Sequence, residues 1–120
     1  MADWFFCRGK VFLATKFGVR GLQDGTRIFS NQPEYIRTAI DGSLERLRTK
    51  WVDLWYWSVH VSARVLRPDA HFSASHRLDG KVPVETVVGT MAEAVTAGKV
   101  KYLGLSECSS ETLRRACKVQ

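Results

Sequence analysis

Short apolar runs and longer helical stripes alternate along this chain. Residues 11–15 form an apolar run bounded by Gly9 and Gly18, and residues 52–57 are rich in branched and aromatic side chains. Continuous apolar runs are typical of strands that are buried on both faces, as in parallel sheets. These two segments, together with residues 100–105, predict three strands.

Two helices are predicted between these strands. Pro33 suits the first position of one helix, because the N–H that proline lacks has no helical partner there. The buried stripe of this helix consists of Ile36, Ala39, Ile40, Leu44 and Leu47. A second helix opens at Pro83 and ends at Gly98, a residue that suits a left-handed cap. Its predicted inner face consists of Val84, Val87, Val88, Met91, Ala92 and Val95.

A third helix is predicted near the end of the sequence. Ser109 or Ser110 can cap it by accepting a hydrogen bond from its first turn. The apolar stripe of this helix begins with Leu113, Ala116 and Cys117. Residues 19–32 instead hold several glycine, aspartate and asparagine residues, which predict a loop.

Strands that alternate with helices imply parallel strands joined by right-handed crossovers. Open doubly wound sheets and closed (β/α)8 barrels both fit this order, and periodicity does not separate them. The 120 residues suffice for one domain. Lys16 follows the first predicted strand at once, and barrel enzymes keep their chemistry at this carboxyl end of the strands.

Composition narrows the class of partner. The 18 basic and 12 acidic residues give a net charge of +6, but the bases are scattered, so neither nucleic acid nor a membrane is expected as a partner. No segment approaches the ~20 apolar residues that cross a bilayer. An odd count of three cysteines without a signal peptide favours a reducing, cytoplasmic location. The three histidines lack regular metal-ligand spacing, so no metal is expected.

Five sequence pieces together resemble the aldo-keto reductases, the NADPH-linked (β/α)8 barrel enzymes. They are VFLATKFG at 11–18, PEYIRTAIDGSLERL at 33–47, VDLWY at 52–56, HRLDGKVPVETVVGTMAEAV at 76–95 and GKVKYLGLSECSSETLRRA at 98–116. Their order and spacing are similar to the third, fourth and fifth strand–helix units of that family. The resemblance implies an α/β fold, namely a partial (β/α)8 TIM barrel of three parallel βα units that does not close. Residues 1–120 then form a single partial aldo-keto reductase domain.

One internal stretch, residues 57–75, departs from the family pattern. In family members the strand runs from DLWY almost directly to a histidine, whereas here 19 residues intervene. The stretch shows no sustained helical or strand period, and Pro68 would break either. It is either a genuine surface loop or non-family sequence, such as a retained intron or a gene-model error.

The resemblance implies NADPH-dependent reduction of aldehydes or ketones to alcohols, with NADP as cofactor and a small carbonyl compound as substrate. Lys16 matches the lysine whose ammonium eases proton release from a catalytic tyrosine. His76 matches the histidine that orients the carbonyl, although Ser58 occupies the place that a continuing strand would give it. Ser106 matches the serine that binds the nicotinamide carboxamide. Without the resemblance, the alternative interpretations are a solvated lysine at position 16, a loop histidine at position 76 and a capping serine at position 106.

Other family residues have no counterpart here. The catalytic aspartate and tyrosine of the family precede the Lys16 strand by a long way, and the ten residues before Val11 contain Asp3 but no tyrosine. The family segments that bind the adenosine phosphate follow the fifth unit and are also missing. The alternative reading is therefore a catalytically inactive fragment with at most a binding or regulatory role.

Three strands do not close a barrel that uses eight. We expect two open sheet edges, one sheet face without helices, and self-association through those edges. Phe12, Trp55 and Val100 are expected to point inward and to lose their partners.

Overall fold

The computed structural model describes residues 7–21, 23–25, 27–58, 82–106 and 108–119. Its centre is a three-stranded parallel sheet in the order β1 (Ala14–Phe17), β4 (Val52–Ser58), β5 (Val100–Ser106). α2 (Pro33–Leu47) precedes β4, α3 (Val84–Thr96) precedes β5, and α4 (Ser110–Ala116) follows β5. The short 3-10 helix η1 (Arg8–Lys10) precedes β1. The expected fold of three parallel strands in an open α/β sheet is confirmed.

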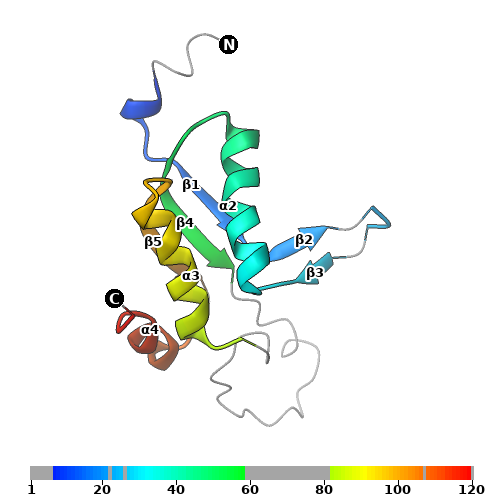
Figure 1. The fold of residues 1–120 in the computed structure, drawn as a ribbon, viewed down its shortest axis with the longest axis vertical. Helices are drawn as coiled ribbons and strands as arrows, with labels where there is room; N and C mark the ends of the chain where they lie inside the picture. Colours follow the sequence, from blue (N-terminus) through cyan, green and yellow to red (C-terminus); the bar gives the residue numbers. More distant parts are fainter. Residues whose placement is uncertain (1–6, 22, 26, 59–81, 107, 120) are drawn as a thin grey trace.

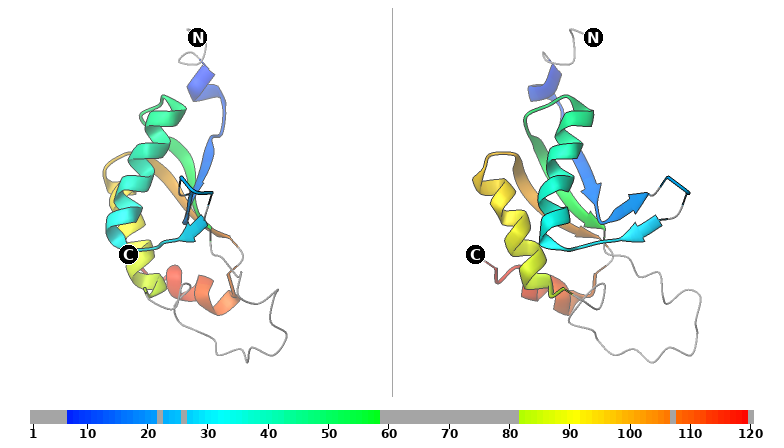
Figure 2. Two further views of the ribbon diagram at one scale, coloured as in Figure 1. Left: turned by 90° about the vertical axis from the view of Figure 1, so that its right-hand side faces the viewer. Right: turned by 45° about the vertical axis from the view of Figure 1, so that its right-hand side comes forward.

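α2 and α3 lie on the same face of the sheet and leave the opposite face bare (Figures 1 and 2). Phe17, Trp55 and Trp57 alternate along their strands and are buried under the helices. The residues between them point to the other face, where Lys16 is exposed and Tyr56 is half-buried. Among the described residues, helices cover one face of the three-stranded sheet and not the other, as the sequence predicted.

The structure corrects the expectation for two of the three side chains that were predicted to point inward and lose their partners. Trp55 is 0% exposed and Val100 is 3% exposed, so both lie in the core instead of losing their partners. Trp55 points to the helix side, where α2 and α3 replace the partners that an inner face would need. Phe12 is 65% exposed, as expected for a side chain without barrel neighbours.

α2 and α3 form where their apolar residues recur at helical spacing. In α2, Ile36, Ile40 and Leu44 are buried as predicted. The buried stripe of α3 consists of Val84, Val87, Thr90, Met91 and Ala94. Val95, which was predicted to face inward, is 38% exposed, because it lies about 100° around the helix from Ala94. Gly98 has a φ of +74°, which confirms the predicted left-handed cap.

Ser109 is the N-cap residue of α4, which decides between the two possible caps. The Ser109 Oγ accepts a hydrogen bond from the Thr112 N–H at 3.1 Å. The predicted apolar stripe is wrong for Leu113, which is 48% exposed, and for Cys117, which is also exposed. Ala116 is buried as predicted, and Thr112 is buried as well. This seven-residue helix contacts α3 through one narrow face, and its two small side chains occupy that face.

The first strand starts later than the apolar run predicts. β1 spans Ala14–Phe17, whereas Val11 and Phe12 lie before it and are 42% and 65% exposed. Lys16 therefore sits within the strand instead of following it. Since β1 is an edge strand with one bare face, an apolar run there is not buried on both sides.

A β-hairpin replaces part of the loop predicted at residues 19–32. β2 (Val19–Gly21) and β3 (Arg27–Phe29) pair antiparallel and project from the carboxyl end of β1 (Figure 1). Gly25, with a φ of +84°, supplies the left-handed conformation in the connection. An Asp-Gly pair between short strands is a hairpin signal, and this signal was present at Asp24 and Gly25.

The predicted insertion at 57–75 lies mostly outside the described residues. Trp57 and Ser58, its first two residues, belong to β4. For the rest of the stretch, a surface loop and non-family sequence both stay predictions. Among the residues that the structure describes, no helix combines the length and hydropathy needed to span a bilayer.

Candidate functional site

The carboxyl ends of β1, β4 and β5 meet at one edge of the sheet, because the three strands run parallel. Lys16 is paired in register with Tyr56, and Tyr56 is paired with Gly104. Ser106 lies two residues beyond Gly104 and is paired with Ser58. Since strand side chains repeat every second residue, Lys16, Tyr56 and Ser106 share the bare face. The backbones of β1 and β5 are about 10 Å apart across β4.

Tyr56 is the neighbour of Lys16 in this group. The Lys16 Nζ lies 5.6 Å from the centroid of the Tyr56 ring, which is within the ~6 Å range of a cation–π contact. Lys16 itself is exposed and forms no ion pair within the described part of the chain. The contact places the ammonium on the bare face, between the edge of the sheet and β4.

Gly104 allows Tyr56 to take this position. A Cβ atom at position 104 would lie 2.5 Å from the Tyr56 Cδ1 and 2.7 Å from its Cε1. Real Cβ atoms do not approach ring carbons so closely, so the ring rests directly on the β5 backbone. Neither Tyr56 nor Gly104 was predicted from the sequence as part of the site. A glycine within a predicted strand was the available signal, because it often marks such a close approach.

Substituting Gly104 with alanine is expected to push the Tyr56 ring off β5 and to destabilise the fold by about 1–3 kcal/mol through overpacking. Gly89 provides the matched control. It lies within α3, and a Cβ there meets nothing within 4 Å, so G89A is expected to stabilise the fold by about 0.5–1 kcal/mol. Urea unfolding followed by circular dichroism measures both changes. Equal stability of G104A and the wild type would contradict the packing described.

Of the two other predicted site residues, Ser106 lies within the described structure and His76 does not. The Ser106 Oγ donates a hydrogen bond to the Trp57 carbonyl oxygen at 3.3 Å, and the serine is half-buried at the end of β5. The hydroxyl oxygen can still accept a hydrogen bond from a further group. His76 lies outside the described residues, so the structure does not bring it together with Lys16 and Ser106. Within the described residues, no group of three or more potential ligands could hold a metal ion.

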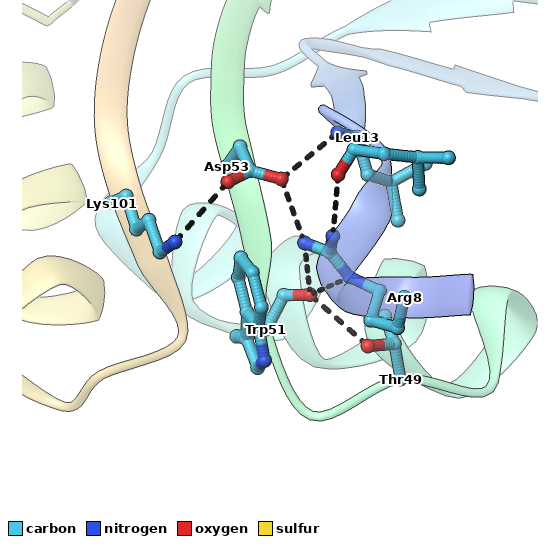
Figure 3. Close-up of polar contacts among 7 residues, drawn as sticks. Arg8, Leu13, Thr49, Trp51, Asp53 and Lys101 are labelled. Carbon is cyan, nitrogen blue, oxygen red and sulfur yellow. Dashed lines mark hydrogen bonds and ion pairs between the residues drawn. The ribbon is translucent and has the colours of Figure 1, made fainter. Parts of the chain in front are cut away.

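A second polar cluster lies at the amino ends of the strands, opposite the candidate site (Figure 3). The Arg8 Nη2 donates to the Asp53 Oδ2 at 2.9 Å, and both side chains are 8% exposed. The remaining Arg8 donors reach the carbonyl oxygens of Trp51 and Val11 at 3.1 to 3.2 Å. The guanidinium carbon also lies 3.5 Å from the centroid of the Trp51 ring. These contacts fasten the segment before β1 to the start of β4.

Asp53 receives donors from three directions. The Leu13 N–H donates to its Oδ2 at 2.9 Å, and the Lys101 Nζ lies 3.4 Å from its Oδ1. The Leu13 hydrogen bond, followed by those from Arg8 and Lys101, holds the pKa of Asp53 below its usual value, although burial acts in the opposite direction. Groups at this end of a barrel contribute to stability more than to catalysis. We therefore assign this cluster a structural role.

The lowered pKa of Asp53 predicts a loss of stability in acid. The folded state favours the carboxylate, so the contribution is complete above the unfolded value of about 3.9 and is lost as the pH falls through the folded pKa. We expect the thermal midpoint of the wild type to fall more steeply below about pH 4 than that of D53N. The variant has no carboxyl group at position 53 that could be protonated. Thermal scans between neutral pH and strong acid measure this, and parallel curves for the two proteins would contradict it.

The sequence profile of the Aldo/keto reductase family matches residues 2–120. The chain is 38% identical over 120 residues to Aldo-keto reductase yakc [NADP(+)] of Schizosaccharomyces pombe, covering 97% of this chain and 30% of that protein. It is 43% identical over 109 residues to Aldo-keto reductase str7 of Strobilurus tenacellus, covering 91% of this chain and 26% of that protein.

Solved structures agree in fold. The glycerol dehydrogenase AKR11B4 from Gluconobacter oxydans superposes with a TM-score of 0.69 at 22% identity, covering 89% of this chain and 28% of that one. The holo form of aldo-keto reductase AKR11C1 from Bacillus halodurans gives a TM-score of 0.67 at 22% identity, covering 94% of this chain and 32% of that one. The chain thus spans about a quarter to a third of the length of the relatives that it matches.

Proposed function

Because the chain belongs to the aldo-keto reductase family, we propose that it supplies part of the active site of an NADPH-dependent carbonyl reductase. The reaction is the reduction of small aldehydes or ketones to alcohols. The observation that carries this proposal is that Lys16 and Ser106 share one face at the carboxyl ends of parallel strands. The relative of Schizosaccharomyces pombe is named as NADP(+)-linked, which supports the choice of cofactor.

Lys16 and Ser106 have separate tasks in this proposal. NADPH, when bound, supplies the hydride that reaches the carbonyl carbon. The exposed ammonium of Lys16 favours ionisation of a nearby phenol and so helps it release a proton to the carbonyl oxygen. That phenol is the family tyrosine, which has no counterpart in this chain. His76 is proposed to orient the carbonyl, by resemblance alone.

Ser106 fits the nicotinamide end of the cofactor. Its proton is directed to the Trp57 carbonyl oxygen, so its own oxygen can accept from the carboxamide N–H of the nicotinamide. A single hydrogen bond of this kind contributes about 0.5–1.5 kcal/mol, which corresponds to about 2–10-fold in affinity.

Titration with NADPH tests the proposal on the 120-residue chain. We expect a change in NADPH fluorescence on binding and a dissociation constant that S106A raises by about 2–10-fold. S110A is the matched control, because Ser110 is an exposed serine on α4 and should leave the affinity unchanged. Equal affinity of S106A and S110A would remove Ser106 from the cofactor site.

The second candidate is a catalytically inactive chain with a binding or regulatory role. It is favoured by the open three-stranded sheet, because an incomplete barrel holds only part of a cofactor site. This function predicts a folded chain that produces no NADPH fluorescence change at millimolar cofactor. A saturable change under the same conditions would reject it in favour of the reductase.

A further inference from the structure

Lys16, Tyr56 and Gly104 form a row across the bare face of the sheet, with one residue on each strand. The row carries no side chain on β5, because its third member is a glycine. The Tyr56 ring lies against this glycine, where a Cβ would be 2.5 Å from the Tyr56 Cδ1. The ring therefore leans from β4 toward β5 and leaves the surface on its other flank to the Lys16 side chain.

An exposed lysine keeps a fixed position only if a contact holds it, because its four-carbon stem is flexible. A charge that assists a reaction must stay in one place relative to the reacting groups. Lys16 forms no ion pair within the described part of the chain. Its ammonium instead lies 5.6 Å from the centroid of the Tyr56 ring. This contact is what the described residues offer to hold the ammonium.

An aromatic ring holds an ammonium in a different way from a carboxylate. The negative face of the ring attracts the cation, but the ring carries no net charge. A carboxylate in the same place would hold the ammonium and also cancel its charge. The contact with Tyr56 therefore leaves the full positive charge of Lys16 available to favour ionisation of a phenol.

We infer that Tyr56 is a positioning residue, whose ring holds the Lys16 ammonium in place without neutralising it. Gly104 belongs to the same arrangement, because only a residue without a Cβ leaves room for the ring. The task of the ammonium rests on the proposed reductase function, whereas the contact between Lys16 and Tyr56 does not. The two parts can therefore be tested separately.

Lysine methylation followed by NMR tests the contact on the 120-residue chain. Reductive methylation with isotope-labelled formaldehyde keeps the charge of each lysine, and methyl groups above a ring face resonate upfield of those in water. We expect an upfield Lys16 signal, assigned by its loss in K16R. Y56F should keep this shift, whereas Y56L and G104A should move the signal to the position of exposed lysines. Lys101 is the internal reference, since its ammonium lies 4.1 Å from the centroid of the Trp51 ring.

Y102L is the matched control for Y56L. Tyr102 is an exposed tyrosine on the same face of β5, and its ring stacks on Phe12. The Lys16 signal should therefore be the same in Y102L as in the wild type, and circular dichroism shows whether each variant is folded. Equal Lys16 signals in Y56L and Y102L would overturn the inference. A wild-type Lys16 signal at the position of exposed lysines would overturn it without any variant.

The positioning role is tested in a chimera in which this chain replaces the matched segment of the Schizosaccharomyces pombe relative. We expect Y56L to lower kcat for carbonyl reduction about 2–5-fold, which is the effect of an exposed cation–π contact, and to leave KM unchanged. Y56F should keep the wild-type kcat, because it keeps the ring. A Y56L chimera as fast as the Y56F chimera would overturn the positioning role. A wild-type chimera without activity would reject the proposed function, and the Lys16 signal would still decide whether Tyr56 holds the ammonium.

Discussion

Replacement of Trp55 by alanine is expected to destabilise the chain by about 3–5 kcal/mol, which is the usual cost of truncating a fully buried tryptophan. Trp55 lies in the middle of β4, the central strand, and is 0% exposed. Its ring packs against Phe17 of the neighbouring strand with centroids 4.5 Å apart. Because the free energy of unfolding of a domain is only about 5–15 kcal/mol, W55A should lose a large part of it and unfold at a much lower urea concentration.

A phenylalanine at the same position separates ring volume from hydrogen bonding. The Trp55 Nε1 is buried and has no hydrogen-bond partner among the residues that the structure describes. W55F removes this unsatisfied donor, a gain that offsets part of the lost volume, so its midpoint in urea should lie near that of the wild type. Urea unfolding followed by circular dichroism measures all three proteins. A W55A midpoint equal to that of W55F would show that the ring is not the centre of the core.

Replacement of Lys16 by methionine is expected to lower kcat for carbonyl reduction by about 10²–10⁴-fold in a chimera in which this chain replaces the matched segment of the Schizosaccharomyces pombe relative. Methionine keeps the length and much of the volume of the side chain but removes the ammonium. Without that charge the phenol of the family tyrosine loses its electrostatic assistance to proton release. NADPH consumption with a small aldehyde measures the rate.

K50M is the control for K16M, because Lys50 is exposed in the connection between α2 and β4. That connection lies at the amino ends of the strands, far from the candidate site. Circular dichroism must show the same fold for both chimeras, so that a lower rate is not caused by a lost fold. A K16M chimera that reduces the aldehyde as fast as the K50M chimera would reject the catalytic role of Lys16.

Two residues of the candidate site could be predicted from the sequence, because each lies within a recognisable motif. Lys16 and Ser106 were found in this way, and the structure puts both on the bare face of the sheet. Tyr56 and Gly104 were missed, because their contact depends on the register between β4 and β5. The predicted role of His76 stays untested. The cytoplasmic location, the lack of a nucleic-acid partner and self-association through the edges likewise stay predictions.

The polar cluster at the amino ends of the strands was likewise not predictable from the sequence. Arg8 and Asp53 are 45 residues apart in the sequence and meet at 2.9 Å. Neither residue stands out locally, since a charged residue at the start of a strand is ordinarily solvated. Only the chain path that brings η1 beside β4 makes the pair buried.

The sequence by itself determined the order of strands and helices, the stripes of α2 and α3, and the helix ends at Pro33, Gly98 and Ser109. These features follow from forces between residues a few positions apart, so a local pattern contains them. Tertiary structure alone decided the exposure of Val11 and Phe12, the burial of Val100 and the neighbours of Lys16. Burial depends on what packs against a residue, and here that was settled by three strands that carry helices on one face and none on the other.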